Sequence, residues 1–553
     1  MTLTGARIVM ECLLEQGVDT VFGLPGGAVL NIYDALYSRR SEIRHILTAH
    51  EQAAAHAADG YARAGGGVGV CLATSGPGAT NLVTGIAAAY MDSVPMVAIT
   101  ANVPVGSLGR DSFQEVDIAG ITMPVTKHNF IVRDVSRLAD TLRRAFYIAR
   151  EGRPGPVLVD IPNDVTAASC TYEPRRPDMP APSAAFGEGD IAMAAELIAD
   201  SKRPLIICGG GVVSGGAAAE LRAFADALDA PVASSLMGLG GFPSSDRRFI
   251  GMIGMHGSQA AALAATSCDL LVAVGCRFSD RVSPRLGRFA PGARLIHIDV
   301  DRAEIGKSLR ADAPIVGDAR LALAALTAAA GRRSNADWVR RTTVSRARYP
   351  IGVRPDSLSP RRVLERLDAV TRGDRVIVTE VGQHQMWVCQ YMAFENPREL
   401  ITSGGLGAMG FGLPAAVGAK LARPGAVVAV VAGDGCFRMN NTELATVAAY
   451  DIPIVVIVMN NHSLGLVRQW QTMFMGGRHS ETSIPPVTDY VKLAEAHGIA
   501  AVSASTEAGA EAAMRTAIES GRPAVVVLEI SPDEKVLPMV PPGSGMDDII
   551  VSL

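Results

Sequence analysis

Residues 427–465 read VVAVVAGDGCFRMNNTELATVAAYDIPIVVIVMNNHSLG. Two apolar, β-branched runs, at residues 426–432 and 454–459, have the length and composition of buried parallel strands. The segment at residues 442–450 lies between them and is long enough to be the helix that connects two such strands. The stretch therefore predicts a βαβ unit, and with it a parallel sheet covered by helices.

Polar side chains follow both predicted strands. Asp434 comes after the first strand and Asn461 after the second, at the edge where open α/β sheets bind ligands. Carboxylate and amide oxygens suit Mg²⁺, whose coordination is commonly completed by phosphate oxygens. Gly433 and Gly435 let backbone amides approach a diphosphate closely. The alternative is an ordinary turn between strand and helix, with Asn441 as the helix cap.

The same alternation of short apolar runs and alanine-rich segments continues along the 553 residues, so we expect an α/β protein of several domains. Further strands are predicted at residues 68–74, 94–100, 156–161, 204–211, 269–275, 294–301 and 523–531. Proline-rich or polar stretches at residues 173–190, 328–337 and 349–360 separate three blocks. The predicted domains span residues 1–165, 190–330 and 360–535, and an irregular, proline-rich tail covers residues 536–553.

Composition excludes several classes of function. Charged residues make up 19% of the chain and the net charge is −4, so neither a nucleic acid nor an anionic membrane is an expected partner. Eight cysteines lie singly, without CxxC or zinc-ligand spacing, as in a protein with reduced thiols. No export signal is visible, and no apolar run reaches the ~20 residues that span a bilayer. We expect a cytoplasmic protein that acts on small molecules.

A second candidate site lies in the first block. The segment ILTAHEQAAAHAADGYARAGG at residues 46–66 places Glu51 at the start of a helix, just after a short strand. An acid at this point could simply favour the helix dipole.

Many motifs together resemble the catalytic subunit of acetohydroxyacid synthase, also called acetolactate synthase, a thiamin diphosphate enzyme. GDG followed by NN at the end of the next strand resembles the diphosphate and Mg²⁺ motif of these enzymes. The other matching motifs, in chain order, are FGLPGGA, HEQ, TSGPGATN, DSFQE, PVTKHNF, GRPGPVLVDIP, GMIGMHG, GCRFSDR, HIDVD, GQHQMW, GGLGAMGFGLPAA, VRQWQ and PMVPPG. The resemblance spans nearly the whole chain. It implies three doubly wound, mainly parallel-sheet domains.

The resemblance assigns roles around thiamin diphosphate. Glu51 is similar to the glutamate that hydrogen-bonds the pyrimidine ring and activates the cofactor. Asp434 and Asn461, with the backbone of Ser463, match the Mg²⁺ ligands. Further matches are the diphosphate binders Gln383 and His384, the bulky residue Met409 that bends the cofactor, the reaction-centre residues Gly27 and Gln114, and Phe113, which is expected against the substrate. Core packing is the alternative for Met409.

The middle block resembles the flavin domain of the same family, in which FAD does no net redox work. Its CGGG sequence is not a GxGxxG fingerprint, and alone it would be an ordinary glycine turn. The positions that match FAD contacts are Arg153, Gly209, Gly210, Ser235, Leu236, Met255, His256, Gly257, Arg277 and Asp299.

Arg281 and Trp470 match the residues that hold the second ketoacid, the arginine by its carboxylate and the tryptophan by its alkyl group. Surface exposure and aromatic packing are their alternatives. Asn163, Leu24 and Leu466 depart from the usual residues of the family, which leaves inhibitor response and fine substrate preference open.

The implied function is an acetohydroxyacid synthase that uses thiamin diphosphate, Mg²⁺ and FAD. It would decarboxylate pyruvate and ligate the hydroxyethyl unit to pyruvate or 2-ketobutyrate in branched-chain amino-acid biosynthesis. Because Glu51 and Asp434 lie in different blocks, the family's active sites between subunits imply a homodimer or homotetramer; a small regulatory subunit is a further expectation.

Three alternatives stay open: a flavin-free catabolic acetolactate synthase, another carboligase such as sulfoacetaldehyde acetyltransferase, and a non-catalytic nucleotide-binding homologue. Glyoxylate carboligase is disfavoured because it lacks the glutamate that Glu51 supplies.

Overall fold

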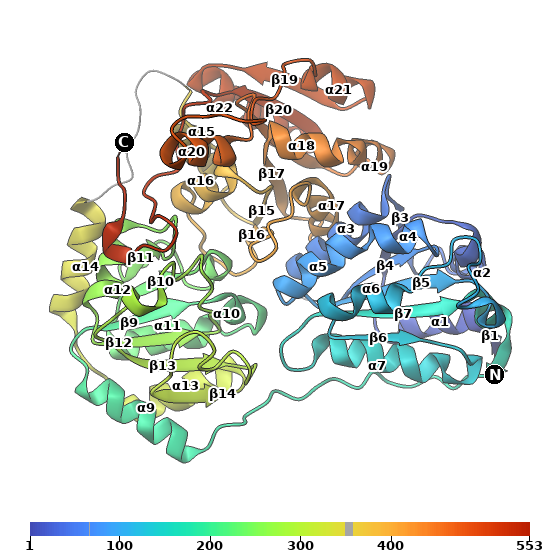
Figure 1. Cartoon of the computed structure of the whole chain (residues 1–553), viewed down its shortest axis with the longest axis horizontal. Helices are drawn as coiled ribbons and strands as arrows, with labels where there is room; N and C mark the ends of the chain where they lie inside the picture. Colours follow the sequence, from blue (N-terminus) through green and yellow to red (C-terminus); the bar gives the residue numbers. More distant parts are fainter. Residues whose placement is uncertain (66, 349–357, 553) are drawn as a thin grey trace.

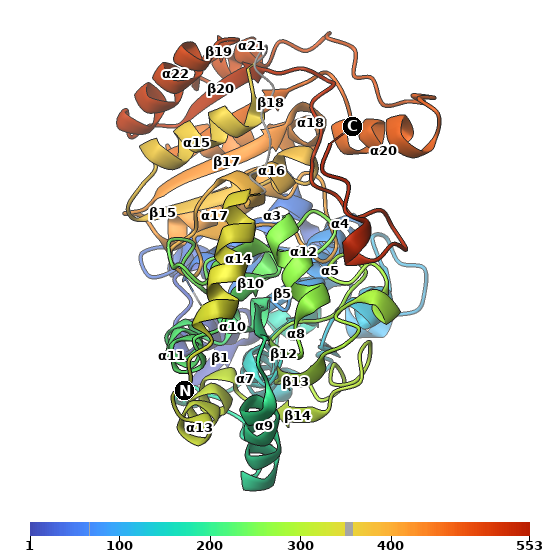
Figure 2. The same cartoon turned by 90° about the vertical axis from the view of Figure 1, so that its left-hand side faces the viewer.

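The structure is a computed structural model that describes residues 1–65, 67–348 and 358–552. It contains three six-stranded sheets, each entirely parallel, with helices on both faces (Figures 1 and 2). The predicted fold class, three doubly wound α/β domains, is confirmed. A two-stranded antiparallel pair, β1 (Thr2–Thr4) with β8 (Ser169–Thr171), joins the two ends of the first domain.

The first domain has the strand order β3-β2-β4-β5-β7-β6. Its sheet consists of β2 (Thr20–Gly23), β3 (Arg44–Leu47), β4 (Gly69–Ala73), β5 (Met96–Asn102), β6 (His128–Ile131) and β7 (Pro156–Pro162). The helices are α1 (Gly5–Glu15), α2 (Leu30–Ser38), α3 (Glu51–Gly65), α4 (Pro77–Asn81), α5 (Val83–Met91), α6 (Ile118–Thr122), α7 (Leu138–Arg150) and α8 (Asn163–Ala167). The central strands are buried on both faces, as their continuous apolar runs predict.

The central domain has the order β11-β10-β9-β12-β13-β14. Its strands are β9 (Pro204–Cys208), β10 (Val232–Ser234), β11 (Phe249–Met252), β12 (Leu270–Val274), β13 (Arg294–Asp299) and β14 (Ala313–Val316). Its helices are α9 (Glu188–Asp200), α10 (Gly210–Ser214), α11 (Ala218–Leu228), α12 (Gln259–Ser267), α13 (Ala319–Ala330) and α14 (Ala336–Arg348).

The third domain has the order β16-β15-β17-β18-β20-β19. Its strands are β15 (Arg375–Thr379), β16 (Leu400–Ile401), β17 (Val427–Gly433), β18 (Ile454–Asn460), β19 (Ala500–Ala504) and β20 (Ala524–Glu529). Its helices are α15 (Pro360–Val370), α16 (Gln383–Tyr391), α17 (Gly412–Ala422), α18 (Asp434–Asn440), α19 (Leu444–Ala449), α20 (Gly465–Phe474), α21 (Tyr490–Ala496) and α22 (Glu507–Glu519).

Helices α3 and α17 join the first domain to the third along a seam of small residues. A Cβ atom added to Gly60 of α3 would lie 2.0 Å from the carbonyl oxygen of Ala415, and one added to Gly418 of α17 would lie 1.8 Å from that of Ala57. The two backbones therefore touch directly, and no larger side chain fits at either glycine. Both helices lie between the two sheets (Figure 1).

The linker and the tail connect the domains along the surface. The predicted linker is extended until Gly187, but α9 begins at Glu188, so its last three residues are helical. Asp190 explains this start, because its carboxylate accepts a bond from the Gly187 amide at 2.9 Å. The tail runs from the third domain back onto the central one (Figure 1), where Asp547 and Asp548 pair with Arg288.

Two other predictions from the sequence need correction. The crossover helix was placed at residues 442–450, but helix begins at Asp434 and is interrupted by the 3₁₀ turn η7 (Asn441–Glu443) before α19. The stretch 328–337 was read as a boundary, yet α14 starts within it, at Ala336. The predicted loop 349–360 lies largely outside the described residues.

Candidate active site

The residues predicted to hold a diphosphate meet at one point of the third sheet. Strand order reverses between β15 and β17, and a ligand crevice is expected where the carboxyl ends of two such strands separate. Gln383 and His384 begin α16 just after β15, and Asp434 begins α18 just after β17. A Cβ atom on Gly433 would lie 2.9 Å from Nδ1 of His384, so the two loops are in contact.

Asp434 has the environment of a cation ligand. Both its carboxylate oxygens are buried, and neither makes a hydrogen bond of ordinary geometry. Burial raises the pKa of Asp434 to about 6, against the weaker opposing effect of nearby backbone amides. A buried carboxylate without a partner is costly, and a bound cation would remove that cost.

Asn461 lies beside this carboxylate at the end of β18. Its side-chain oxygen accepts a bond from the Ser463 amide at 3.0 Å, and its Nδ2 lies 3.4 Å from Oε1 of Gln383. In the described part of the chain no three His, Cys, Asp or Glu side chains gather to hold a metal. The pair Asp434 and Asn461 therefore fits an ion whose remaining ligands come from outside the chain, as Mg²⁺ bound to a diphosphate has.

Glu380 is a further residue of this corner, which the sequence did not single out. Its fully buried carboxylate accepts bonds from the amides of Gly410 and Gly412, both at 2.8 Å. These amides directly follow Met409 in the chain, and Cε of Met409 would lie 3.9 Å from a Cβ atom on Gly435. Burial raises the pKa of Glu380 to about 7. The sequence does carry a signal for Glu380. It is an acid directly after the apolar run RVIVT, in the position that Asp434 has after its own strand.

A cavity of about 700 Å³ lies between the central and third domains and is closed on one side by the first. It brings together most of the residues assigned to FAD and to the second ketoacid. These are Arg153, Gly210, Ser235, Leu236, Met255, His256, Arg277, Asp299, Arg281 and Trp470. Gly209 and Gly257 are chain neighbours of lining residues but do not line it. Leu466, one of the departures from the family pattern, also lines the wall.

The cavity opens at the switch point of the central sheet, between β9 and β12. A Cβ atom on Gly209 would lie 2.1 Å from the Gly275 carbonyl oxygen, so the chain after each strand is tightly packed there. Arg153 donates to Ser93 at 2.8 Å and to Glu304 at 2.9 Å, which fixes a guanidinium at the wall. Apolar walls with a few fixed polar groups suit a large planar cofactor such as a flavin.

Burial shifts the pKa values of two other polar groups of this wall. Burial lowers the pKa of His256 to about 4, and its Nδ1 has no hydrogen-bond partner. Burial raises the pKa of Asp299 to about 6. The indole nitrogen of Trp470 is also buried without a partner, while its ring packs edge-on against Phe474. The unpaired ring nitrogens of His256 and Trp470 are available to a ligand.

The predicted residues of the first domain form a separate group. The Glu51 carboxylate is 7% exposed and accepts a bond from Nδ2 of Asn81 at 2.9 Å. Gln114 has a left-handed backbone, with φ of 59°, and lies against Gly76. Gly27 is exposed, and the side chain of Phe113 is 87% exposed. None of these four residues lines the cavity.

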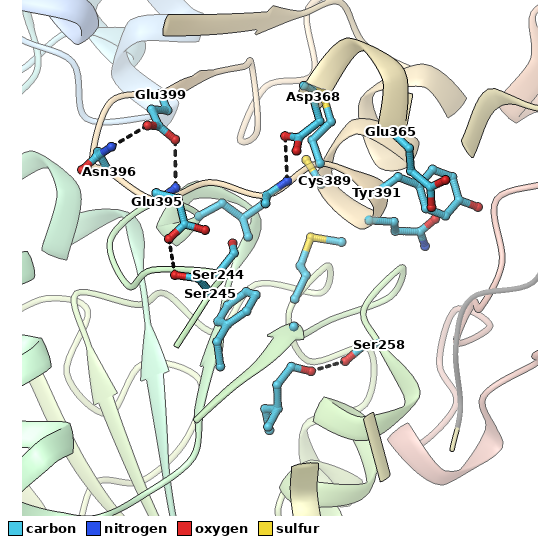
Figure 3. A pocket seen from close by; sticks show the side chains of 18 of the residues that line it. Ser244, Ser245, Ser258, Glu365, Asp368, Cys389, Tyr391, Glu395, Asn396 and Glu399 are labelled. Atoms are coloured by element: carbon cyan, nitrogen blue, oxygen red, sulfur yellow. Dashed lines mark hydrogen bonds between the residues drawn. The ribbon is translucent and has the colours of Figure 1, made fainter. Parts of the chain in front are cut away.

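A second cavity, of about 820 Å³, is lined by residues of the central and third domains (Figure 3). None of the predicted site residues lines it. Its acidic side chains are engaged locally: Glu399 accepts from Asn396 and Asp368 from the Ala393 amide. It therefore plays no part in the site.

Family models match all three domains. The N-terminal TPP binding domain of thiamine pyrophosphate enzymes matches residues 3–121, the central domain residues 191–326, and the C-terminal TPP binding domain residues 380–528. The acetolactate synthase large subunit of Corynebacterium glutamicum is 47% identical over 100% of this chain and 90% of its own length. A probable acetolactate synthase large subunit of Methanocaldococcus jannaschii is 46% identical over 99% of this chain and 95% of its own length. The isozyme 3 large subunit of Escherichia coli K12 is 42% identical over 100% of this chain and 99% of its own.

The chain belongs to the acetolactate synthase family of thiamine pyrophosphate enzymes. Thiamine pyrophosphate, also called thiamin diphosphate, is therefore its cofactor, and the family resemblance inferred from the sequence is confirmed. As for membranes, none of the helices in the described ranges has both the length and the apolar character to cross one.

Proposed function

We propose that this acetolactate synthase family member condenses pyruvate with a second 2-ketoacid, as a catalytic subunit in branched-chain amino-acid biosynthesis. The observation that carries the proposal is the cavity that Arg281 and Trp470 share with the residues assigned to FAD. A flavin-free catabolic enzyme has no use for those assigned contacts. A non-catalytic homologue has no use for the unpaired Asp434.

Thiamin diphosphate supplies the chemistry that removes CO₂ from the first ketoacid and makes the remaining carbon nucleophilic. The residues of the chain hold and orient it. Asp434, Asn461 and the Ser463 backbone would hold Mg²⁺, Gln383 and His384 would contact the diphosphate, and Met409 would support the cofactor from below its rings. Glu51 would hydrogen-bond the pyrimidine ring and hold a proton at its carboxylate.

The acceptor ketoacid is held by charge and by an apolar surface. Arg281 offers a guanidinium that pairs with a carboxylate through two parallel bonds. Its Nη1 lies 3.6 Å from Sδ of Met255 and 3.4 Å from Oδ2 of Asp280, and its side chain is 60% exposed. In a homodimer or homotetramer the first domain of the partner subunit would complete the site, so that Glu51, Gly27, Gln114 and Phe113 of one subunit act together with Asp434 and Asn461 of the other. A small regulatory subunit would accompany this large one.

The experiment is a product assay with the purified, cofactor-loaded protein. Pyruvate alone should give acetolactate, and added 2-ketobutyrate should give acetohydroxybutyrate in competition. Consumption of pyruvate without either product would support another carboligase, and no consumption at all would support a non-catalytic homologue.

We expect the protein to bind FAD and to need it. The purified chain should be yellow, or should quench the fluorescence of added FAD. Turnover should depend on FAD without net reduction of the flavin. Riboflavin is the matched control: it lacks the diphosphate and adenine that the long cavity between Gly210 and Arg153 would hold, so it should bind more weakly. A chain that makes acetolactate but fails to bind saturating FAD would be a flavin-free catabolic synthase.

We expect Trp470→Leu to remove acceptor preference and keep the chemistry. The two acceptors differ by one methylene, and such discrimination is worth about 1 to 3 kcal/mol, or about 10 to 200-fold. The variant should still make acetolactate from pyruvate, while its bias toward 2-ketobutyrate falls several-fold in direct competition.

Phe474→Leu is the matched control, because Phe474 lies on the same helix, packs on the Trp470 ring at 5.8 Å, and does not line the cavity. It should leave the product ratio unchanged. An unchanged ratio in Trp470→Leu itself would make Trp470 a packing residue.

A further inference from the structure

Glu443 is a buried acid of the third domain whose carboxylate reaches the first domain. It ends the 3₁₀ turn η7, nine positions after Asp434, and is 1% exposed. Its Oε1 accepts a bond from the Ala49 amide at 3.0 Å, and its Oε2 accepts one from the Thr446 hydroxyl at 2.7 Å. The backbone amide of His50 also points to this carboxylate.

The segment that Glu443 holds leads directly into α3. Residues 48–50 connect β3 to the first residue of that helix, Glu51. The same segment is fixed on its other side by Tyr450, whose hydroxyl accepts a bond from the Leu47 amide at 2.9 Å. The Thr446 hydroxyl also donates to the Leu47 carbonyl oxygen at 3.3 Å. The third domain therefore contacts the four residues before Glu51 through Glu443, Thr446 and Tyr450.

A buried position such as that of Glu443 is unfavourable for a carboxyl group unless the hydrogen bonds it accepts have a role. Burial raises the pKa of Glu443 to about 7, while the bonds from Thr446, Ala49 and His50 oppose that rise. An apolar side chain of similar size would stabilise a buried position better than a carboxyl group does. Leu444, the next residue, shows that the surroundings accept a fully buried apolar side chain.

We propose that Glu443 is a positioning residue for Glu51. By fixing the amides of Ala49 and His50 it sets where α3 begins, and with that the place from which the Glu51 carboxylate reaches the cofactor. Asn81 orients the carboxylate itself from within the first domain. Glu443 does not touch the cofactor, and the proposal rests on the proposed function. A displacement of about 1 Å in a catalytic group can cost about 100-fold in rate.

Three variants test this role. Glu443→Ala removes the bonds accepted from Ala49, His50 and Thr446 and should lower kcat about 10 to 100-fold. The KM for pyruvate and the Kd for thiamin diphosphate should stay within ~3-fold, because the diphosphate site is untouched. Glu443→Gln keeps an oxygen for Ala49 and should recover most of the rate. Tyr450→Phe removes only the bond between the Tyr450 hydroxyl and the Leu47 amide, and it leaves the hydrophobic core intact. It therefore tests the same segment if Glu443→Ala folds poorly. We expect it to lower kcat by a few-fold and to leave the KM for pyruvate unchanged.

The matched control is Glu399→Gln. Glu399 is 4% exposed and accepts from the Glu395 amide at 2.9 Å and from Asn396 at 2.7 Å, all within the third domain (Figure 3). It should leave kcat within ~2-fold. Amide hydrogen exchange of the cofactor-free chain gives a readout besides activity: residues 47–50 should exchange faster in Glu443→Ala and Tyr450→Phe, and not in Glu399→Gln.

Wild-type kcat in Glu443→Ala, or equal losses in Glu443→Ala and Glu399→Gln, would overturn the proposal. A fall in cofactor affinity that accounts for the whole loss of rate would also overturn it. If the wild-type chain makes no acetolactate, the proposed function is wrong. The amide hydrogen exchange of residues 47–50 would still decide whether Glu443 holds the segment before Glu51.

Discussion

Glu51→Gln is expected to bind thiamin diphosphate and to lose most of its turnover. The side chain keeps its size, so the bond with Asn81 and the start of α3 can be retained. A neutral amide cannot share a proton with the pyrimidine ring as a carboxylate does. Positioned acid–base groups contribute about 10² to 10⁴-fold to rate, and the loss should fall in that range.

The measurement is kcat across the pH range, together with the Kd for the cofactor. Glu42→Gln is the matched control, because it makes the same chemical change in the same domain at an exposed side chain that pairs with Arg39. The control should behave as wild type. Near wild-type activity of Glu51→Gln at every pH would mean that this glutamate only favours the helix dipole.

Asp434→Asn should weaken binding of thiamin diphosphate and Mg²⁺ by about 100-fold or more, since even outer partners of a metal site contribute about 10 to 100-fold in affinity. The cofactor-free variant should unfold at a temperature no lower than wild type. The reason is that the change removes a buried carboxylate whose oxygens make no hydrogen bond of ordinary geometry with the described residues. A loss of ligand affinity without loss of stability is the signature of a ligand-binding group.

Titration of the cofactor at several Mg²⁺ concentrations measures this effect, and thermal unfolding of the cofactor-free chains supplies the comparison. Asp160→Asn is a suitable control: Asp160 is as deeply buried, but Thr100 and Asn102 donate to both its oxygens, so its loss should lower stability and spare the cofactor. If Asp434→Asn matches wild type in affinity and in its response to chelators, the diphosphate corner lies elsewhere.

The sequence predicted the parts of the fold that depend on local pattern. The apolar runs became β17 and β18 within one residue of their predicted ends. The place of Asp434 and Asn461 followed from that, because parallel strands end at the same edge of a sheet. Helix α18 was missed because its sequence, DGCFRMN, has no amphipathic period and directly continues a glycine turn.

The contacts between domains could not be predicted in this way. Glu443 and Ala49 are 394 positions apart, and no local pattern relates them. Glu380 is likewise an ordinary strand-end acid until the loop of Gly410 folds onto it. The 87% exposure of Phe113 also depends on how distant parts of the chain pack, which periodicity does not encode.

The glycine seam between α3 and α17 limits how the chain can be rebuilt from parts. Since Gly60 and Gly418 each lie against the opposite backbone, the two helices are complementary in shape down to single atoms. A chimera that takes its first domain from one relative and its third from another would have to match both surfaces at once. The central domain adds a third surface to match, because the Ser244 hydroxyl donates to the Phe394 carbonyl at 3.0 Å and a Cβ atom on Gly240 would lie 2.4 Å from the carbonyl oxygen of Asn396. Recombination between relatives is therefore expected to preserve activity only where it keeps these matched surfaces together.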